Sequence, residues 1–149
     1  MRYTVIFDAC VLYPAPLRDF LLRLSTTGLF SAKWTDRIHD EWIRNLLESR
    51  PDLEEKLSRT RELMNQAVPD SLVAGFESLI ENLELPDADD RHVLAAAIRS
   101  GAQAIITFNL KDFPDDVLAQ YVSFPRSSVG MHPQTLQRRV TNKEHNNGS

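Results

Sequence analysis

Carboxylates recur in this chain where an apolar segment ends. Asp8 directly follows the apolar run 3–7, three aspartates lie within residues 87–90, and Asp112 comes shortly after the apolar segment 104–107. Burial of a carboxylate is unfavourable unless a partner compensates its charge, so a cation is the expected partner. Three or four converging carboxylates without a histidine or cysteine cluster suit a hard cation such as Mg²⁺ or Mn²⁺.

Each of these acidic positions also has an ordinary structural explanation. Asp87 fits the N-cap of the helix that follows it, and Asp89 and Asp90 in the first turn complement the helix dipole. Asp112 lies in a segment that is typical of a turn. Asp8 is harder to explain in this way, because the strand that precedes it has the pattern of a buried strand.

The elements that position these side chains alternate between strands and helices. We expect strands at 3–7, 29–34, 83–85, 104–107 and 121–124, and helices at 17–27, 36–48, from 51 onward, at 69–80 and at 87–100. This alternation predicts a three-layer α/β/α fold around a parallel sheet of about five strands. Because the carboxyl ends of parallel strands share one edge, the acidic residues could converge there. We expect one domain over residues 1–140 and a flexible tail at 141–149.

Length and composition argue against a membrane protein, a secreted protein and a disulfide-bonded protein. The 149 residues suit a single domain, and no apolar run or leader pattern indicates a membrane span or a signal peptide. The lone cysteine, Cys10, excludes an internal disulfide and favours a reducing, cytoplasmic location. The net charge of −4 gives no basic footprint for nucleic acid, although a metal bound by acidic residues can itself hold phosphates. The four histidines show no ligand spacing, and we interpret them as structural or exposed.

Four segments of the chain resemble motifs of the PIN-domain ribonuclease family, which includes the VapC-like toxins of bacterial toxin–antitoxin pairs. They are residues 5–12 around Asp8, residues 34–42 with Glu41, residues 87–97, and residues 105–114 with Thr107, Asn109 and Asp112. The resemblance covers residues 1–125, and its last two motifs are the most specific in order and spacing.

The resemblance implies a PIN-like fold and metal-dependent hydrolysis of RNA phosphodiester bonds. It assigns catalytic roles to Asp8, Glu41, Asp90 and Asp112, with Mg²⁺ or Mn²⁺ held by Asp8, Asp90, Asp112 and Asp87. Asp8 and Asp90 would be the main ligands, whereas Glu41 and Asp112 would bind a second ion directly or through water. Many relatives carry aspartate where this chain has Asn109, so either Asp112 supplies the late carboxylate or the metal site has fewer ligands. Helical periodicity alone, in contrast, favours a solvated Glu41.

The same resemblance suggests roles for polar and basic residues near the motifs. Thr107 and Asn109 would orient water or phosphate by hydrogen bonds. The candidate RNA contacts are Arg18, Lys33, Arg37, Arg44, Arg91 and Lys111, although each also fits a solvated, exposed position. The implied partners are an RNA substrate, an antitoxin protein and a second copy of the chain in a homodimer.

Two other interpretations are open at this point. Asn109 in place of aspartate could mark a weakened site, in which case the domain binds RNA or a protein without cutting. Phe7-Asp8-Ala9 also resembles the nucleophile strand of haloacid-dehalogenase-like hydrolases, in which Asp8 would attack covalently. Cys10 and Val11 depart from that second pattern.

Overall fold

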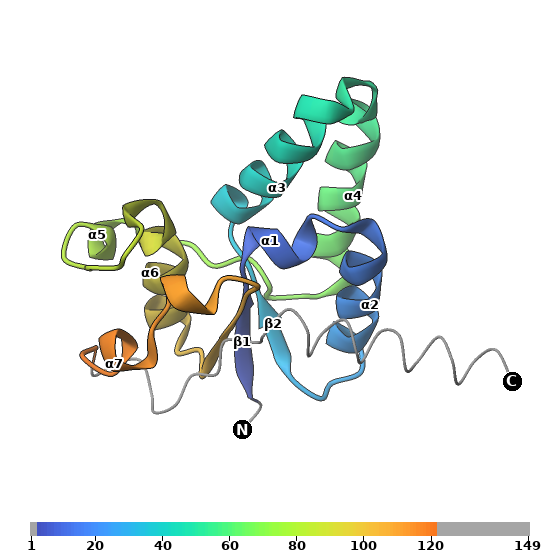
Figure 1. Cartoon of the computed structure of the whole chain (residues 1–149). Coiled ribbons are helices and arrows are strands. Elements are labelled where there is room, and N and C mark those ends of the chain that lie inside the picture. Colours follow the sequence, from blue (N-terminus) through green and yellow to red (C-terminus); the bar gives the residue numbers. More distant parts are fainter. Residues whose placement is uncertain (1–2, 122–149) are drawn as a thin grey trace, which may run out of the picture.

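The centre of the molecule is a parallel sheet, seen in a computed structural model that describes residues 3–121 (Figure 1). Its strands β1 (Thr4–Phe7), β2 (Ser31–Lys33) and β3 (Ala104–Ile106) lie in the order β2-β1-β3. In register, Val5 lies opposite Ala32 on one side and Ala104 on the other. The central strand β1 is covered on both faces, which explains its apolar sequence.

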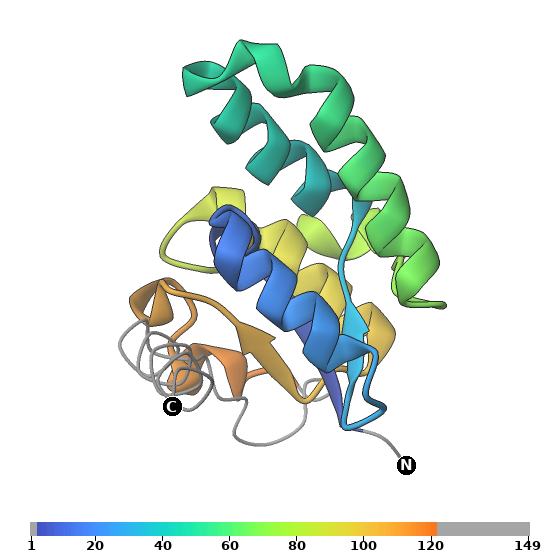
Figure 2. The same ribbon diagram turned by 90° about the vertical axis from the view of Figure 1, so that its right-hand side faces the viewer.

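Helices cover both faces of this sheet. Helix α2 (Ala15–Ser25) lies on one face and α6 (Arg91–Ser100) on the other (Figures 1 and 2). The apolar stretch 93–97 of α6 is fully buried, because alanine side chains let the helix approach the sheet closely. Gly101 ends α6 in the left-handed conformation at a φ of 68°, which only glycine adopts without strain.

An arm of two helices stands beyond the carboxyl ends of the strands (Figure 1). Helix α3 (Asp36–Ser49) and helix α4 (Glu54–Ala67) are joined by the 3₁₀ turn Pro51–Leu53. The other described elements are α1 (Ala9–Leu12), α5 (Glu77–Ile80), α7 (Asp115–Leu118) and the 3₁₀ turns Ala88–Asp90 and Leu110–Asp112. None of the helices within residues 3–121 has the length and apolar character needed to cross a bilayer.

The structure corrects the expected helix at 69–80. Asp70 has a φ of 64° and Gly75 a φ of 76°, so the backbone turns twice where a helix would continue. Between these turns the chain is extended, and Leu72 pairs in parallel with Trp34 beyond the end of β2. Only Glu77–Ile80 is helical, because the pairing with Trp34 satisfies the backbone groups that a longer helix would have used.

The sheet is also smaller than expected. The part of the chain that the structure describes contributes three strands rather than about five. Residues 83–85 are irregular, and the strand expected at 121–124 lies almost wholly outside the described residues. The expected domain limit at 140 and the tail at 141–149 also lie outside them.

A buried hydrogen-bond network fixes the arm to the sheet. His39 of α3 accepts a bond from the indole N–H of Trp42 at Nδ1, at 3.0 Å. Its Nε2 therefore carries the proton and donates to Asn65 Oδ1 of α4 at 3.0 Å. The same oxygen accepts from the indole N–H of Trp34 at 2.7 Å, and burial lowers the pKa of His39, which keeps the ring neutral. One amide oxygen thus serves two fully buried rings.

We expect Asn65→Leu to destabilise the protein by about 1–3 kcal/mol, because it leaves the Trp34 and His39 donors without an acceptor. Urea unfolding would measure this as a lower midpoint at an unchanged slope. The exposed neighbour Gln66 offers a matched control, and Gln66→Leu should change stability by less than about 0.5 kcal/mol. Equal midpoints for the two variants would show that the network does not stabilise the arm.

Candidate active site

Asp8 occupies the point where β1 ends and α1 begins. The residue is 5% exposed, and its extended backbone makes it the N-cap of α1. Its Oδ1 accepts from the backbone N–H of Ala9 at 2.8 Å, and its Oδ2 accepts from the Thr107 hydroxyl at 2.8 Å. Burial raises the pKa of Asp8, whereas these two hydrogen bonds oppose the rise. The carboxylate is therefore held in one orientation at the edge of the sheet.

Thr107 holds Asp8 from the neighbouring strand. It follows β3, is fully buried, and accepts from the backbone N–H of Asn109 at 3.0 Å while it donates to Asp8. Cys10 lies beside this pair, with its sulfur 3.5 Å from both Asp8 Oδ2 and Thr107 Oγ1. Burial raises the pKa of the Cys10 thiol to about 12, so it is protonated at neutral pH. In this arrangement Thr107 orients a carboxylate and has no exposed surface to offer a phosphate.

Asp90 shows that the acidic residues lie near one another. It ends the 3₁₀ turn before α6 and is half-buried. Burial is the largest cause that raises its pKa to about 7, followed by the charges of Asp8, Asp112, Asp87 and Glu41. Carboxylates from four separate segments therefore act on one site, and their repulsion favours the protonated form of Asp90.

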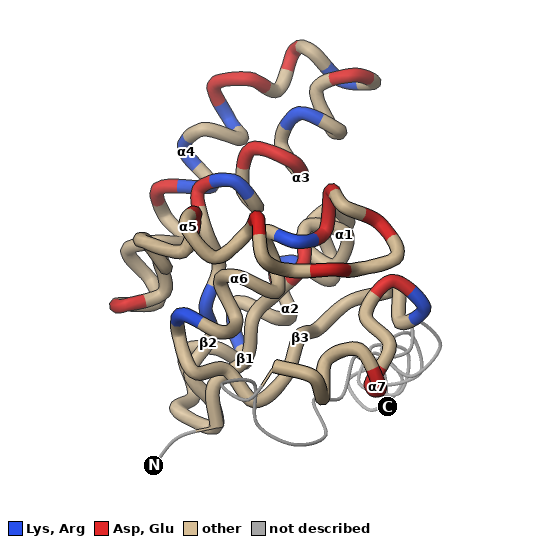
Figure 3. The backbone as a smooth tube through the Cα atoms, turned by 90° about the vertical axis from the view of Figure 1, so that its left-hand side faces the viewer, with Lys and Arg blue, Asp and Glu red and all other residues tan. Residues whose placement is uncertain are grey.

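The remaining predicted acidic residues differ in their surroundings. Asp87 is exposed, and its side chain accepts from the backbone N–H of Asp89 at 2.9 Å, as an N-cap does. Asp112 is half-buried at the end of the turn after β3, whereas Asn109 is exposed. Figure 3 shows acidic positions on the side of the molecule where α1, α3 and the start of α6 lie.

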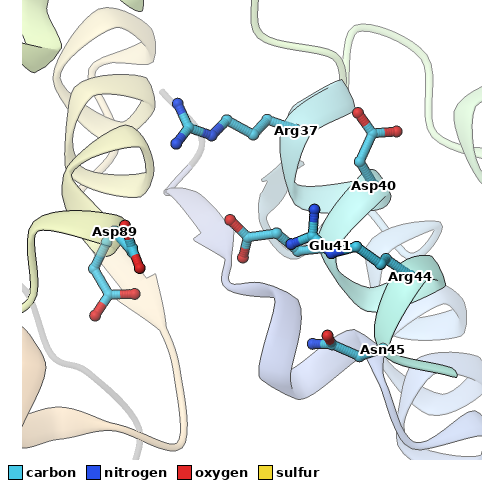
Figure 4. Close-up of a pocket in the computed structure, with 7 residues that line it drawn as sticks. Arg37, Asp40, Glu41, Arg44, Asn45 and Asp89 are labelled. Atoms are coloured by element: carbon cyan, nitrogen blue, oxygen red, sulfur yellow. The ribbon is translucent and has the colours of Figure 1, made fainter. Parts of the chain in front are cut away.

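Glu41 reaches this region from α3. It lines a pocket of about 400 Å³ together with Asp89 and Asp90, and its carboxylate extends from α3 toward Asp89 (Figure 4). The other residues that line the pocket are Arg37, Asp40, Arg44 and Asn45. Periodicity favoured a solvated Glu41, but the residue lines a pocket, because the 3₁₀ turn Ala88–Asp90 faces α3 across it.

His92 is a residue near the site that the sequence analysis left without a role. Its Nε2 lies 2.5 Å from Glu41 Oε1, and the residue is 1% exposed. It comes two positions after Asp90, but Glu41 is far away in the sequence. No spacing rule links the two residues, and only the packing of α3 opposite α6 brings them together.

The candidate RNA-contacting residues fall into two groups. Arg18 is 7% exposed, donates to the carbonyl of Leu12 at 2.8 Å and stacks 4.5 Å from the Trp42 ring, so it is occupied inside the protein. Arg91 is half-buried and donates to the carbonyl of Ala88 at 3.0 Å. The exposed cations are Arg37, Arg44 and Lys111.

The donor set fits a hard divalent cation. The side chains that converge are carboxylates, and burial together with their mutual repulsion raises the pKa of Asp90, which a bound cation would counteract. Within residues 3–121, however, no three Asp, Glu, His or Cys side chains already stand in the geometry of a metal centre. Side-chain rotation would be needed to close a ligand set around an ion.

A parallel α/β sheet with acidic residues at its carboxyl edge is the architecture expected for a PIN domain, and this chain belongs to the PIN-domain family. The family's sequence profile matches residues 4–111, which include Asp8, Glu41, Asp90 and Thr107. A Mycobacterium tuberculosis protein named "Putative ribonuclease VapC50" is 66% identical over 32 residues, which cover 22% of this chain and 19% of that protein. No solved structure is significantly similar to this chain.

The family match confirms the resemblance on which the sequence analysis relied. It also assigns the strand before Asp8 to the PIN domain, so the haloacid-dehalogenase interpretation has no support beyond Phe7-Asp8-Ala9. The roles of the individual residues stay predictions.

Proposed function

We propose that this protein is a metal-dependent endoribonuclease that hydrolyses RNA phosphodiester bonds. The observation that carries the proposal is the convergence of carboxylates on Asp90, whose charges add to burial, the largest cause, in raising its pKa to about 7. Perturbed carboxylates at the carboxyl edge of a parallel sheet are typical of functional sites. Membership of the PIN-domain family and the ribonuclease name of the VapC50 relative support the same activity.

In this proposal each residue has a role that depends on its position in the site. Asp8 and Asp90 would hold Mg²⁺ or Mn²⁺, with Glu41 and Asp112 completing the set directly or through water. When bound, such an ion neutralises the phosphodiester and lowers the pKa of a bound water. Thr107 fixes the orientation of Asp8 through its 2.8 Å hydrogen bond, and Asn109 at the exposed rim could orient water or phosphate. Asp87 is already engaged as an N-cap, which favours Asp90 as the ligand of this segment.

Incubation of the purified protein with mixed RNA tests this function. We expect cleavage with Mn²⁺ or Mg²⁺, no cleavage with EDTA, and recovery when metal is restored. Binding of RNA without cleavage in either metal would favour the alternative, a PIN-like binding module whose late acidic position is occupied by Asn109. Cleavage that persists in EDTA would contradict a metal-dependent mechanism.

Exposed arginines on α3 would guide the RNA. Arg37 and Arg44 line the same pocket as Glu41, one turn before and one turn after it. Both are exposed and form no ion pair within the described residues. Seven residues along a helix span about 10 Å, so the two guanidinium groups could hold backbone phosphates on either side of the cleaved one. The exposed Lys111, in the turn after β3, would add a weaker contact.

We expect Arg37→Ala and Arg44→Ala each to weaken RNA binding by a similar factor whatever the sequence of the RNA. Each lost phosphate contact should reduce the slope of log affinity against log salt by about 0.7 for a single strand. Fluorescence anisotropy with a short RNA in EDTA would measure this without cleavage. Arg23→Ala, an exposed arginine on α2, should leave the slope unchanged. An unchanged slope in the α3 variants would place the RNA elsewhere.

We further propose that the protein is the toxin of a toxin–antitoxin pair, works in the cytoplasm and forms a homodimer. The name of the VapC50 relative supports the first point, but the match spans only 19% of that protein. A short DNA-binding protein encoded beside this chain, which copurifies with it and blocks cleavage, would support the pairing. If no such gene lies beside it, a processing nuclease becomes the better description.

A further inference from the structure

His92 is a buried histidine whose ring nitrogens form no standard hydrogen bond within the described residues. It is the second residue of α6 and is 1% exposed, and the six residues that follow it in the helix are apolar. Within the described residues its Nδ1 has no hydrogen-bond partner. Its Nε2 closely approaches one polar atom, Oε1 of Glu41, at 2.5 Å. Burial of an imidazole costs free energy when its nitrogens are unsatisfied, so an apolar side chain would suit this position better.

His39 shows what a purely structural histidine looks like in this protein. Both of its ring nitrogens are bonded, to Trp42 on one side and to Asn65 on the other. His92 has no such network, and its only close polar contact leads to a predicted catalytic residue. This contrast points to a role for the His92 ring that depends on Glu41.

Glu41 needs such a partner. It projects from α3 into the pocket, its side chain is 27% exposed, and no other ion pair holds it within residues 3–121. A free glutamate samples many rotamers, and fixing it costs conformational entropy. Nε2 of His92 lies within contact distance but is not aligned for a standard hydrogen bond, so a rotation of the Glu41 carboxylate would complete the bond.

We propose that His92 is a positioning residue for Glu41. The ring donates its Nε2–H to Oε1 and holds the carboxylate on the side of the pocket where Asp90 lies, leaving Oε2 free to face an ion or water. Because His92 is buried in α6, its ring is held in a fixed position. Residues that hydrogen-bond to metal ligands commonly orient those ligands in this way. The metal-related part of this inference rests on the proposed nuclease function, whereas the contact between the two side chains does not.

The test compares His92→Leu, which removes the donor, with His92→Gln, whose amide can replace Nε2–H. We expect His92→Leu to weaken Mn²⁺ binding by about 10–100-fold, measured by calorimetry, and to lower kcat rather than raise KM. The metal-free melting temperature should not fall. His92→Gln should restore most of the affinity and the rate. In a Glu41→Gln background, His92→Leu should change Mn²⁺ affinity much less, because the residue that it positions is already altered.

A spectroscopic readout separates this inference from the proposed function. In ¹⁵N-labelled protein without metal, the Nε2–H proton of His92 should be protected from exchange and should shift in Glu41→Ala. If it does so but the wild type neither binds Mn²⁺ nor cleaves RNA, the positioning contact stands and the nuclease function is wrong. An unshifted ring proton, wild-type Mn²⁺ affinity in His92→Leu, or an equal loss in the Glu41→Gln background would each overturn the inference.

Discussion

The Asp8→Asn variant should cleave RNA at least about 100-fold more slowly than the wild type, with its fold intact. The substitution removes the charge that the proposal gives to a metal ligand but keeps the shape of the side chain. Asparagine can still accept from the Ala9 N–H, which lies 2.8 Å from Oδ1 in the wild type. Its amide would face the Thr107 hydroxyl, which now donates at 2.8 Å and would have to turn.

Two opposing effects keep the change in the free energy of unfolding of Asp8→Asn small. The altered bond to Thr107 weakens the folded state, whereas loss of a buried charge strengthens it, since burial raises the pKa of Asp8. We expect a net change within about 1 kcal/mol. Initial cleavage rates with Mn²⁺ and a circular dichroism melt would measure both quantities. Asp116→Asn, an exposed change on α7, should retain full activity. Wild-type cleavage by the Asp8 variant would place the chemistry elsewhere.

Asp90→Asn should stabilise the metal-free protein at pH 8 and remove most of its response to Mn²⁺. The pKa of Asp90 is raised from 3.8 to about 7, chiefly by burial and then by the charge of Asp8. The folded state therefore binds a proton that the unfolded state has released, and this contribution to stability is lost as pH rises from 3.8 to about 7. Asparagine cannot ionise, so the variant escapes that loss.

Melting curves at pH 5 and pH 8, with and without Mn²⁺, would show this. At pH 8 a Mn²⁺ concentration 100 times the dissociation constant should stabilise the wild type by about 2.7 kcal/mol. Asp90→Asn should gain less than about 1 kcal/mol, because it lacks a main ligand of the proposed site. Asp89→Asn, a change at the exposed neighbouring residue, should respond as the wild type does. A full response in Asp90→Asn, or loss of the response in Asp89→Asn alone, would reassign the ligand.

Local signals in the sequence predicted those elements whose cause is local. The apolar runs before Asp8 and Thr107 form β1 and β3, and Gly101 ends α6 because it adopts the left-handed conformation. Parallel pairing then explains why acidic residues far apart in the sequence act together on Asp90. These few facts are enough to predict which edge of the sheet carries the candidate site.

Features that depend on distant partners could not be predicted in the same way. The helix expected at 69–80 is short because Leu72 pairs with Trp34, a contact that the apolar spacing of the segment does not encode. Arg18 is an arginine on a surface-type helix, yet it stacks on Trp42 of another helix. Periodicity placed Glu41 in solvent because it describes α3 alone, whereas the opposite wall of the pocket belongs to the 3₁₀ turn Ala88–Asp90.

The bond between Asp8 and Thr107 makes reactivity depend on how two strands are aligned. Phe7 lies opposite Ile106, so the residue after each strand meets its counterpart across the sheet. A slip of one position would turn every side chain of that strand to the opposite face and carry the hydroxyl out of reach. A molecule with such a register slip could keep its helix content and compactness but lack the oriented Asp8 carboxylate, and with it the proposed activity. The turnover of a preparation is thus a more sensitive gauge of correct folding than its helical signal.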